Sequence, residues 1–447
     1  MKKLLLIIHA LLFSMLGFSQ GIEFEHGTWK EVLAKAQQTN KPVFVDVYTT
    51  WCGPCKMMDR DIFPLEAVGK VYNAGFVCYH LDAEKGEGIE VAKKYEVKAY
   101  PTYLFIKADG TLFFRSMGSM EAKAFLEVSN TALSEFKDPK TLSDWEKEYA
   151  ARKNDPKFLS DYIDKRSKQG LSNATFFDDY LKLIPEEERT SDNVVRLYKY
   201  TAETLKVNSF AYTNLKKNND ILAGKFSGFN LLYYGIENTV SEAAKSKNEQ
   251  LLTSAMSAYD QLPNGVAPNS KDELYMQYFQ RTKETDKYVK HASNFCNNHL
   301  MKMNDDSIAI KDKVSAQLLE KRISAGEFAN LDSSRIAQIR AYAAHGEKNK
   351  ISLLLNDIAW TVFLKVSDKN VLQNALNWSK RSRELAPDNS GYLVTYANLL
   401  YKLGRKDEAI TSEKEALGYD AKANKEPNAT MVEVLRKMIA GEKTWTD

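Results

Sequence analysis

Residues 42–55 read PVFVDVYTTWCGPC, an apolar run that leads into two cysteines three positions apart. The run 42–48 is apolar on both faces except for Asp46, which is typical of a strand buried in the middle of a mostly parallel sheet. A Gly-Pro pair then opens a helix, which we expect to continue until Pro64. This order of strand, turn and helix predicts an α/β domain with two thiols at the turn.

The two cysteines have the spacing of a redox-active pair. Cys52 would lie at the exposed start of the helix, where free backbone N–H groups and the positive end of the helix dipole stabilise a thiolate. Cys55 would lie on the same face but deeper, from where it can attack a mixed disulfide formed at Cys52. We therefore predict that Cys52 is the catalytic nucleophile and that Cys55 is the resolving thiol, and that the two form a redox disulfide.

Asp46 is a candidate for the acid and base of this chemistry. A lone carboxylate in a buried strand is costly to ionise, so its pKa should rise toward the range in which it can exchange a proton with Cys55. A hydrogen-bonded structural carboxylate at the strand end is the alternative. The cysteine pair also has two alternatives, half of a zinc site or an inert disulfide. No second Cys/His pair with zinc spacing follows nearby, whereas the inert disulfide stays open.

Here the chain resembles the thioredoxin family over residues 22–137. Its motifs in this sequence are VDVY at 45–48, WCGPCK at 51–56, YPT at 100–102 and Gly118 before a last helix. KPV at 41–43 and DIF at 61–63 look closer to periplasmic relatives, such as the soluble C-terminal domain of bacterial membrane thiol reductases. The resemblance implies a thioredoxin fold, in which a central mixed sheet is flanked by helices.

The resemblance also implies the roles of individual residues. Cys52 attacks, Cys55 resolves and Asp46 is the buried acid. Cys78 is a departure, because it falls near the position at which many thioredoxins carry a buried lysine close to the acid. The pKa of Asp46 therefore cannot be taken over from the family.

A substrate-binding surface is implied next to the cysteines. Pro101 is expected to follow a cis peptide bond and to face the pair, and the backbone of Tyr100 is expected to pair with an extended substrate segment. Trp51, Gly53 and Pro54 border the cysteines and complete this predicted surface. Tyr100 replaces the small aliphatic or polar residue that is common in the family, so the substrate preference is expected to differ.

The remaining elements of this domain follow from apolar runs and turn residues. We expect helices over 28–38, 91–95 and 118–136, strands ending at Asp82 and over 102–106, and a hairpin turn at 108–110 followed by a strand over 111–116.

Residues 1–19 have a basic start, a short apolar stretch and small residues near the end, which together predict a cleaved signal peptide. An uncleaved membrane anchor is the weaker alternative, because the stretch is short for a bilayer span of about 20 residues. Without Lys2 and Lys3 the excess of basic over acidic residues falls from 62 − 59 = 3 to 60 − 59 = 1. A near-neutral chain does not favour binding to nucleic acid. We therefore expect a periplasmic or secreted protein.

The chain has four cysteines, too few for a disulfide framework in a chain of 447 residues. Cys78 lies in a predicted core strand and is expected to be a packed thiol. Cys296 stands close to His291 and His299 on one predicted helix, an arrangement that more often reflects packing than metal binding. We predict no metal site and no cofactor.

Beyond a boundary near residues 137–141 the pattern becomes helical. A capping box at Ser143 to Glu146 and an N-cap at Asp155 before Pro156 predict two helix starts. Amphipathic stretches such as 194–205 and 274–295 continue a helical domain over 141–350. Aromatic residues recur there at helical spacing, as a core stripe or, less often, as a peptide-binding groove.

Residues 351–447 carry an internal repeat. Ala375 and Ala409 are 34 residues apart, as are Ser382 and Ala416, a period that resembles tetratricopeptide repeats. Two such units are too few to be stable alone, so the preceding helices should stack on them. The repeats could bind an extended peptide or serve as a structural cap.

The sequence favours a thiol–disulfide oxidoreductase that reduces protein disulfides outside the cytoplasm, because Gly-Pro between the cysteines is typical of reducing thioredoxins. A reductase in an oxidising compartment needs an electron donor, and we expect a separate membrane thiol reductase. The alternatives are a protein-binding adaptor built on the repeats, with the thioredoxin-like domain as an accessory, and a disulfide isomerase.

Overall fold

A computed structural model describes residues 21–226, 230–263, 267, 269–326, 328, 333–422 and 428–445. The predicted signal peptide, residues 1–19, lies outside this range. The chain divides into two compact units after Gly235, and each unit is described by itself below. The predicted domain boundaries at 137–141 and at 350 stay predictions.

The first unit contains the predicted mixed sheet, which has five strands in the order β1-β3-β2-β4-β5. The central strand β2 (Val43–Tyr48) runs parallel to β3 (Val77–Asp82) and antiparallel to β4 (Thr102–Ile106). The edges are β1 (Phe24–Glu25), parallel to β3, and β5 (Leu112–Met117), antiparallel to β4. The two-residue strand β1 was not predicted. The other four confirm the predicted strands to within one or two residues.

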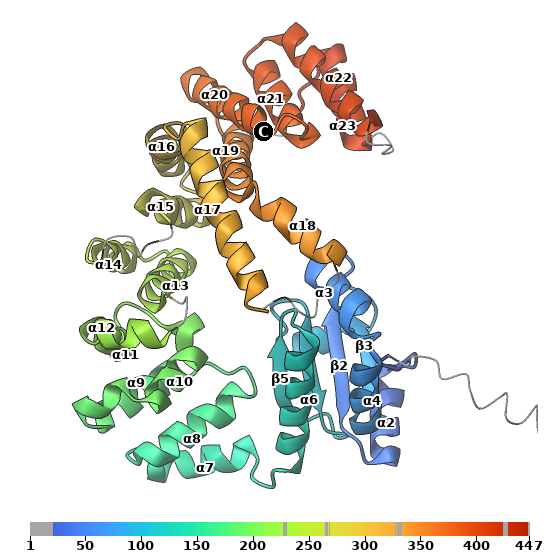
Figure 1. Cartoon of the computed structure of the whole chain (residues 1–447), viewed down its shortest axis with the longest axis vertical. Helices are drawn as coiled ribbons and strands as arrows, with labels where there is room; N and C mark the ends of the chain where they lie inside the picture. Colours follow the sequence, from blue (N-terminus) through green and yellow to red (C-terminus); the bar gives the residue numbers. More distant parts are fainter. Residues whose placement is uncertain are drawn as a thin grey trace, which may run out of the picture. The chain divides into compact units, whose positions relative to one another are not determined.

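Helices cover both faces of this sheet (Figure 1). They are α2 (Trp29–Thr39), α3 (Gly53–Met57) with the π-helical segment η1 (Met58–Ile62), α4 (Glu66–Gly75), α5 (Gly88–Lys94) and α6 (Ala122–Lys137). The predicted α/β thioredoxin fold is confirmed. The last helix starts at Ala122, after Gly118, which has a positive φ of 84°.

Alternation along β2 divides the core into two layers. Val43, Val45 and Val47 belong to the cluster that contains side chains of α2 and α5. Phe44 belongs to the other cluster, together with side chains of η1, α4 and α6. Since successive side chains of a strand point to opposite faces, Asp46 shares the face of Phe44 and points toward the helix that carries the cysteines.

Helices follow the sheet within the first unit. Their bounds are α7 (Leu142–Arg152), α8 (Pro156–Ser167), α9 (Ala174–Leu183), η2 (Glu186–Thr190), α10 (Asp192–Thr201), η3 (Ala202–Thr204), α11 (Phe210–Lys217), α12 (Asn219–Leu222), η4 (Ala223–Lys225) and α13 (Leu231–Ser246), which continues into the second unit. The predicted N-cap at Asp155 is confirmed. The predicted capping box at Ser143 is wrong, because Thr141 and Asp144 form the reciprocal bonds that begin α7.

Helix α8 is joined to the edge of the sheet and to α6. The backbone N–H of Arg115 in β5 donates to the carbonyl oxygen of Lys168 at 2.8 Å. The buried Nζ of Lys165 lies 2.8 Å from Glu135 and 2.7 Å from Asp138, at the end of α6. This backbone bond and this buried ion cluster attach the first of the helices to the thioredoxin-like part.

The second unit is helical throughout its described residues. It contains α14 (Glu249–Tyr259), α15 (Lys271–Thr282), α16 (Thr285–Phe295), η5 (Cys296–Leu300), α17 (Asp305–Ser324), α18 (Ser333–Ala343), α19 (Gly346–Lys365), α20 (Lys369–Leu385), α21 (Ser390–Lys402), α22 (Lys406–Lys422) and α23 (Ala429–Ala440). The stretch 274–295 is two helices, because Lys283 adopts a left-handed conformation with φ 64° between them. None of the described helices is both long and apolar enough to cross a bilayer.

The small residues of the predicted repeat all lie in the core of the second unit. Ala375 of α20 and Ala409 of α22 are both buried, and so are Ser382 and Ala416. Small buried side chains allow neighbouring helices to approach closely, which is the packing that a repeat of helix pairs requires.

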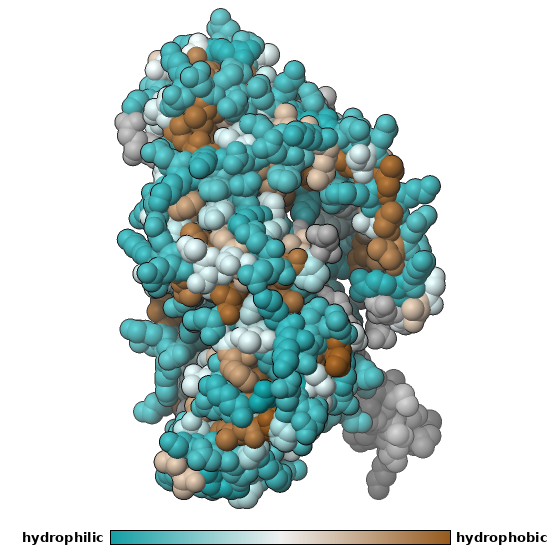
Figure 2. All heavy atoms as spheres, turned by 90° about the vertical axis from the view of Figure 1, so that its left-hand side faces the viewer, coloured by the Kyte–Doolittle hydropathy of each residue, from teal (hydrophilic) through white to brown (hydrophobic). Residues whose placement is uncertain are grey.

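The aromatic side chains of the helices lie mostly in the core. Tyr198, Tyr233, Tyr278, Phe158 and Phe177 are among the largest fully buried side chains. The face of the molecule drawn in Figure 2 is mainly hydrophilic, with apolar side chains in separate patches. The aromatic spacing therefore reflects packing between helices, as expected.

Candidate functional site

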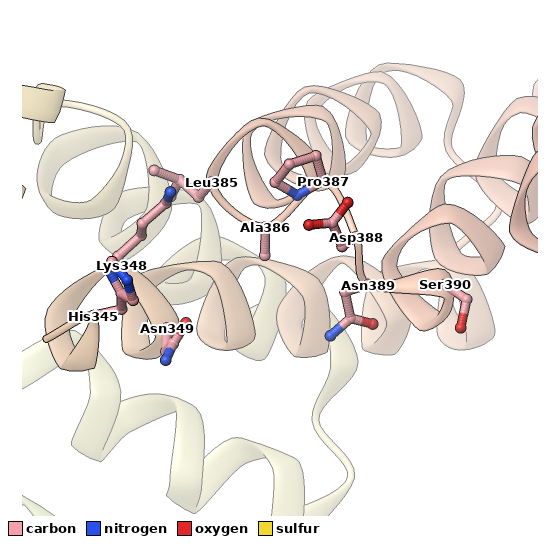
Figure 3. Close-up of a pocket in the computed structure, with 9 residues that line it drawn as sticks. All are labelled: His345, Lys348, Asn349, Leu385, Ala386, Pro387, Asp388, Asn389 and Ser390. Carbon is pink, nitrogen blue, oxygen red and sulfur yellow. The ribbon is translucent and has the colours of Figure 1, made fainter. Parts of the chain in front are cut away.

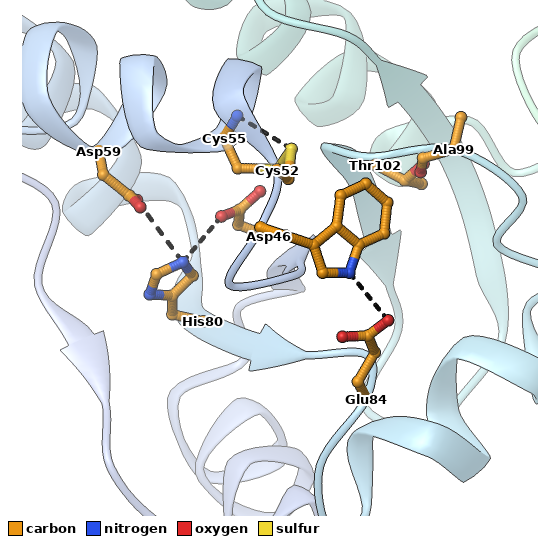
Figure 4. Close-up of a disulfide and its surroundings, with 9 residues drawn as sticks. Asp46, Cys52, Cys55, Asp59, His80, Glu84, Ala99 and Thr102 are labelled. Atoms are coloured by element: carbon orange, nitrogen blue, oxygen red, sulfur yellow. Dashed lines mark hydrogen bonds and ion pairs between the residues drawn. A yellow bond between two sulfur atoms is a disulfide. The ribbon is translucent and has the colours of Figure 1, made fainter. Parts of the chain in front are cut away.

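Cys52 and Cys55 form a disulfide at the turn between β2 and α3 (Figure 4). Cys52 is the N-cap of α3, and its Sγ accepts a hydrogen bond from the backbone N–H of Cys55 at 3.1 Å. The same N–H group and the positive end of the helix dipole would stabilise a thiolate at Cys52 after reduction. Cys52 is only 3% exposed, less than the sequence suggested, but its neighbours Gly53 and Pro54 are exposed. The disulfide therefore lies just beneath the surface.

Trp51 and Tyr100 form the rim of this site. The Trp51 side chain is 65% exposed, and its ring centroid lies 6.0 Å from that of Tyr100 in an edge-to-face arrangement. The Trp51 Nε1–H donates to Oε1 of Glu84 at 3.0 Å, which fixes the indole above the loop after β3. This contact brings the predicted rim residues together. The sequence did not single out Glu84.

The peptide bond between Tyr100 and Pro101 is cis, as the resemblance implied. On either side of it, the hydroxyl of Thr102 donates to the carbonyl oxygen of Ala99 at 2.7 Å, and both residues lie across from the disulfide in Figure 4. The carbonyl oxygen of Pro101 accepts from the N–H of Gly118 at 2.9 Å. This loop is therefore held in place beside the cysteines, where an extended substrate segment was predicted to pair.

Asp46 lies on the inner side of the disulfide and is 1% exposed. Its Oδ2 lies 3.0 Å from Nε2 of His80, and the same nitrogen lies 3.5 Å from Oδ1 of Asp59. Burial raises the pKa of Asp46, and the contact with His80 offsets only part of that rise. Burial also raises the pKa of Asp59. Asp46 therefore has the raised pKa that the sequence predicted. Its partner, His80, was not predicted.

The partner of Asp46 is His80, not a residue at Cys78. In the register of the two parallel strands, Asp46 lies opposite His80, and Phe44 lies opposite Cys78. Cys78 is 1% exposed, and burial raises the pKa of its thiol far above the ordinary value, so it is a packed thiol as expected. The signal in the sequence was His80 itself, a polar residue in the apolar run 77–81. It stands two positions after Cys78 and therefore lies on the same face of the strand.

Asp46, Asp59 and His80 are also the group whose ligand atoms lie close enough to hold a metal ion, within 4.8 Å of one another, in the described part of the chain. Of the other three residues considered in the sequence, Cys296 is buried and Nδ1 of His291 lies 2.6 Å from a carboxylate oxygen of Asp272.

Comparisons with known proteins bear on residues 29–133, which match a family model described as a thioredoxin-like domain. Thioredoxin Y2 from the chloroplasts of Arabidopsis thaliana is 36% identical over 97 residues, which cover 22% of this chain and 54% of that protein. A thioredoxin from Borreliella burgdorferi is 37% identical over 89 residues, covering 20% of this chain and 71% of that protein. The chain spans about half the length of the first chloroplast relatives that it matches.

Two solved structures are also similar to this part of the chain. A candidate disulphide isomerase from Bacteroides thetaiotaomicron is 39% identical and has a TM-score of 0.24, with 27% of this chain and 96% of that chain covered. A thioredoxin from Thermus thermophilus is 25% identical and has a TM-score of 0.23, with 25% and 86% covered. From the family match and the relative from Borreliella burgdorferi, we conclude that this chain belongs to the thioredoxin family through its residues 29–133.

Proposed function

We propose that this protein is an extracytoplasmic thiol–disulfide oxidoreductase that reduces disulfides of protein clients through Cys52 and Cys55. The observation that carries the proposal is the disulfide itself, at a helix N-terminus, beneath an exposed tryptophan and above a buried carboxylate. An inert structural bridge needs none of these neighbours. A pair that exchanges with clients needs a stabilised thiolate, a rim for the client and a group that accepts a proton.

In the reduced protein, the thiolate of Cys52 attacks a client disulfide, and one client sulfur leaves as a thiolate. Cys55 then loses its proton and attacks Sγ of Cys52, so that the Cys52–Cys55 bond forms and the second client sulfur leaves. Two electrons pass from the two cysteines to the client. Tyr100 and Trp51 lie where an extended client segment would approach the sulfur atoms, with their rings in contact.

The location outside the cytoplasm rests on the predicted signal peptide at residues 1–19. An oxidising compartment would keep the pair oxidised, so each cycle needs fresh electrons. We propose that a separate membrane thiol reductase supplies them by reducing the Cys52–Cys55 disulfide.

For the helices of the second unit we propose a docking role. The buried small residues at the 34-residue spacing support two tetratricopeptide-like repeats over α19–α22. A pocket of about 470 Å³ opens beside them, lined by His345, Lys348, Asn349 and the loop 385–390 (Figure 3). It contains no cysteine, so it has no part in the redox chemistry, and its mixed polar and apolar lining suits the backbone and side chains of an extended peptide.

The Cys55→Ser variant tests the proposed function. It keeps the nucleophile Cys52 but cannot resolve, so in periplasmic or secreted extracts it should accumulate mixed disulfides that dithiothreitol releases. The Cys52→Ser variant is the matched control and should trap nothing. In the same experiment, the wild-type protein should reduce insulin with dithiothreitol as donor.

If Cys55→Ser traps no client, and proteins bind the full chain equally well without either cysteine, then the adaptor is the correct function. A wild-type protein that rearranges scrambled disulfides faster than it reduces insulin would instead be an isomerase. Either outcome would refute the proposed function as a protein-disulfide reductase.

A further inference from the structure

Asp46, Asp59 and His80 meet at one point of the first unit, although β2, η1 and β3 each contribute one of them. Nε2 of His80 lies 3.0 Å from Oδ2 of Asp46 and 3.5 Å from Oδ1 of Asp59. Imidazole nitrogen and carboxylate oxygen are both ligands of divalent transition-metal ions. The prediction of no metal site did not include this group, because it forms only when the chain folds.

The carboxyl groups of Asp46 and Asp59 share one imidazole as their partner. Within the ranges that the structure describes, neither carboxylate forms an ion pair with a lysine or an arginine, and both face His80. Arg60, next to Asp59 in the chain, binds the carboxylate of Asp61 through two nitrogen atoms. Buried charges in proteins are paired or bound to metal, and a divalent cation would balance two ionised carboxylates.

Two buried atoms of this group lack hydrogen bonds. Asp46 is 1% exposed, its carboxyl group points toward the imidazole in Figure 4, and its Oδ1 has no hydrogen-bond partner among the described residues. Nε2 of His80 also has none there, although two carboxylate oxygens lie close to it, so these oxygens flank the N–H direction instead of lying in line with it. Ligands of one metal ion are arranged in this way, because the ion itself lies in line with the nitrogen lone pair.

The distances suit a small ion with four ligands. In a tetrahedral zinc site with bonds of about 2.0–2.1 Å, neighbouring ligand atoms are about 3.3 Å apart. The two distances from Nε2 lie on either side of this value, and the two carboxylate oxygens lie within 4.8 Å of each other. Rotation of the Asp59 side chain, which is 39% exposed, can shorten the last distance.

The site also has a fixed ligand and a path to solvent. The ring of His80 is held by Tyr48, with centroids 4.0 Å apart, and by Phe24 at 5.1 Å. The side chain of His80 is 27% exposed, so an ion can enter from solvent on the side of His80 and Asp59. The same side has room for water as a fourth ligand, as in zinc sites with three protein ligands.

We propose that Asp46, Asp59 and His80 form a binding site for a divalent transition-metal ion, with Zn²⁺ as the ion that fits best. The two aspartates bind through carboxylate oxygens and His80 binds through Nε2. The ion lies on the inner side of the Cys52–Cys55 disulfide, because Figure 4 draws the carboxyl group of Asp46 between the disulfide and His80. The site needs no redox activity, so this inference does not rest on the proposed function.

The test measures Zn²⁺ binding to the oxidised full chain, prepared without a histidine tag. In this form Cys52 and Cys55 are joined and offer no thiolate to the metal, and Cys78 and Cys296 are buried. Titration of Zn²⁺ in competition with a chelating dye should show one site per chain with a dissociation constant of about 10 μM or tighter. Saturating Zn²⁺ should also raise the melting temperature of the first unit, because the ion binds only the folded state.

The Asp59→Asn variant removes the most exposed ligand and leaves the core intact. It should weaken Zn²⁺ binding by at least about tenfold, because even the loss of an outer partner of a metal ligand costs about 10- to 100-fold in affinity. His80→Gln should have an effect of at least the same size. His291→Gln is the matched control: His291 pairs with Asp272, but no third ligand residue joins them in the described part of the chain, so the affinity should not change.

A wild-type dissociation constant weaker than about 10 μM would overturn the inference. Zn²⁺ binding of equal strength in the wild type, Asp59→Asn and His80→Gln would also overturn it, because the ion would then bind elsewhere. A loss of affinity in His291→Gln alone would place the ion at His291 and would likewise overturn it. The reductase function is tested separately with the reduced protein and stands or falls independently of these results.

Discussion

Glu413 predicts a pH-dependent stability of the second unit. It lies in α22 with its side chain fully buried, and neither of its carboxylate oxygens has a hydrogen-bond partner among the residues that the structure describes. Burial raises the pKa of Glu413 from 4.5 to about 7. The folded unit therefore keeps a proton on Glu413 at pH values at which the unfolded chain has lost it.

The sign and the size of the effect follow from this difference in pKa. Below a pH of about 4.5 both states are protonated, and the carboxyl group adds no pH-dependent cost. As the pH rises to about 7, the free energy of unfolding falls, and above that pH the full loss is present. A shift of about 2.5 pKa units corresponds to about 3 kcal/mol, since one unit is about 1.4 kcal/mol.

The Glu413→Met variant keeps a side chain of similar length and removes the titrating group. Its stabilisation relative to the wild type should be larger at about pH 8 than at about pH 4.5, by about 3 kcal/mol. In calorimetry of the full chain, this would raise the melting temperature of the second unit by about 6–12 °C at the higher pH.

Glu415 lies in the same helix with an exposed side chain and provides the control. Glu415→Gln should change the stability by less than about 0.5 kcal/mol at either pH. A difference between Glu413→Met and the wild type that is the same at both pH values would refute the reasoning, because it would show that Glu413 does not titrate differently in the folded and unfolded states.

Two further predictions concern the first unit. Lys165→Met removes a buried cation from the carboxylate of Glu135 and should lower the free energy of unfolding, measured with urea, by about 3 kcal/mol. The double variant with Glu135→Leu should recover most of this loss. A double variant as unstable as the single one would contradict the role given to this buried ion pair. Gly88→Ala would place a Cβ 2.0 Å from the carbonyl oxygen of Asp82, so the free energy of unfolding should fall by about 2–4 kcal/mol in thermal unfolding. Gly224→Ala is the control, because a Cβ there meets no atom within 4 Å, and it should cost less than about 1 kcal/mol. Equal effects at the two glycines would count against this explanation.

Much of the thioredoxin-like part could be predicted because its signals are local. The central strand, the helix start at the cysteines and the hairpin near residue 110 depend on neighbours within a few positions of the chain. The capping box at Ser143 was wrong for the same reason, because two overlapping candidates lie within a few residues and only the geometry of the helix start chooses between them.

The environment of the site was harder to predict because it depends on register between distant segments. Asp46 meets His80 only because β2 and β3 pair in parallel with this alignment. Asp59 reaches the same nitrogen from the π-helical segment after the cysteines, where the wider turn changes the direction of the side chains. Neither contact follows from spacing in the sequence.

Local sequence is enough to specify two thiols at a helix start with an acid in the preceding strand, because those residues lie within ten positions of one another. The surroundings that control ionisation arise only when the chain folds: the imidazole beside Asp46, the buried carboxyl group of Glu413, and Lys165 between Glu135 and Asp138. The physical reason is that a pKa depends on burial and on nearby charges, and both are set by segments that meet only when the chain folds.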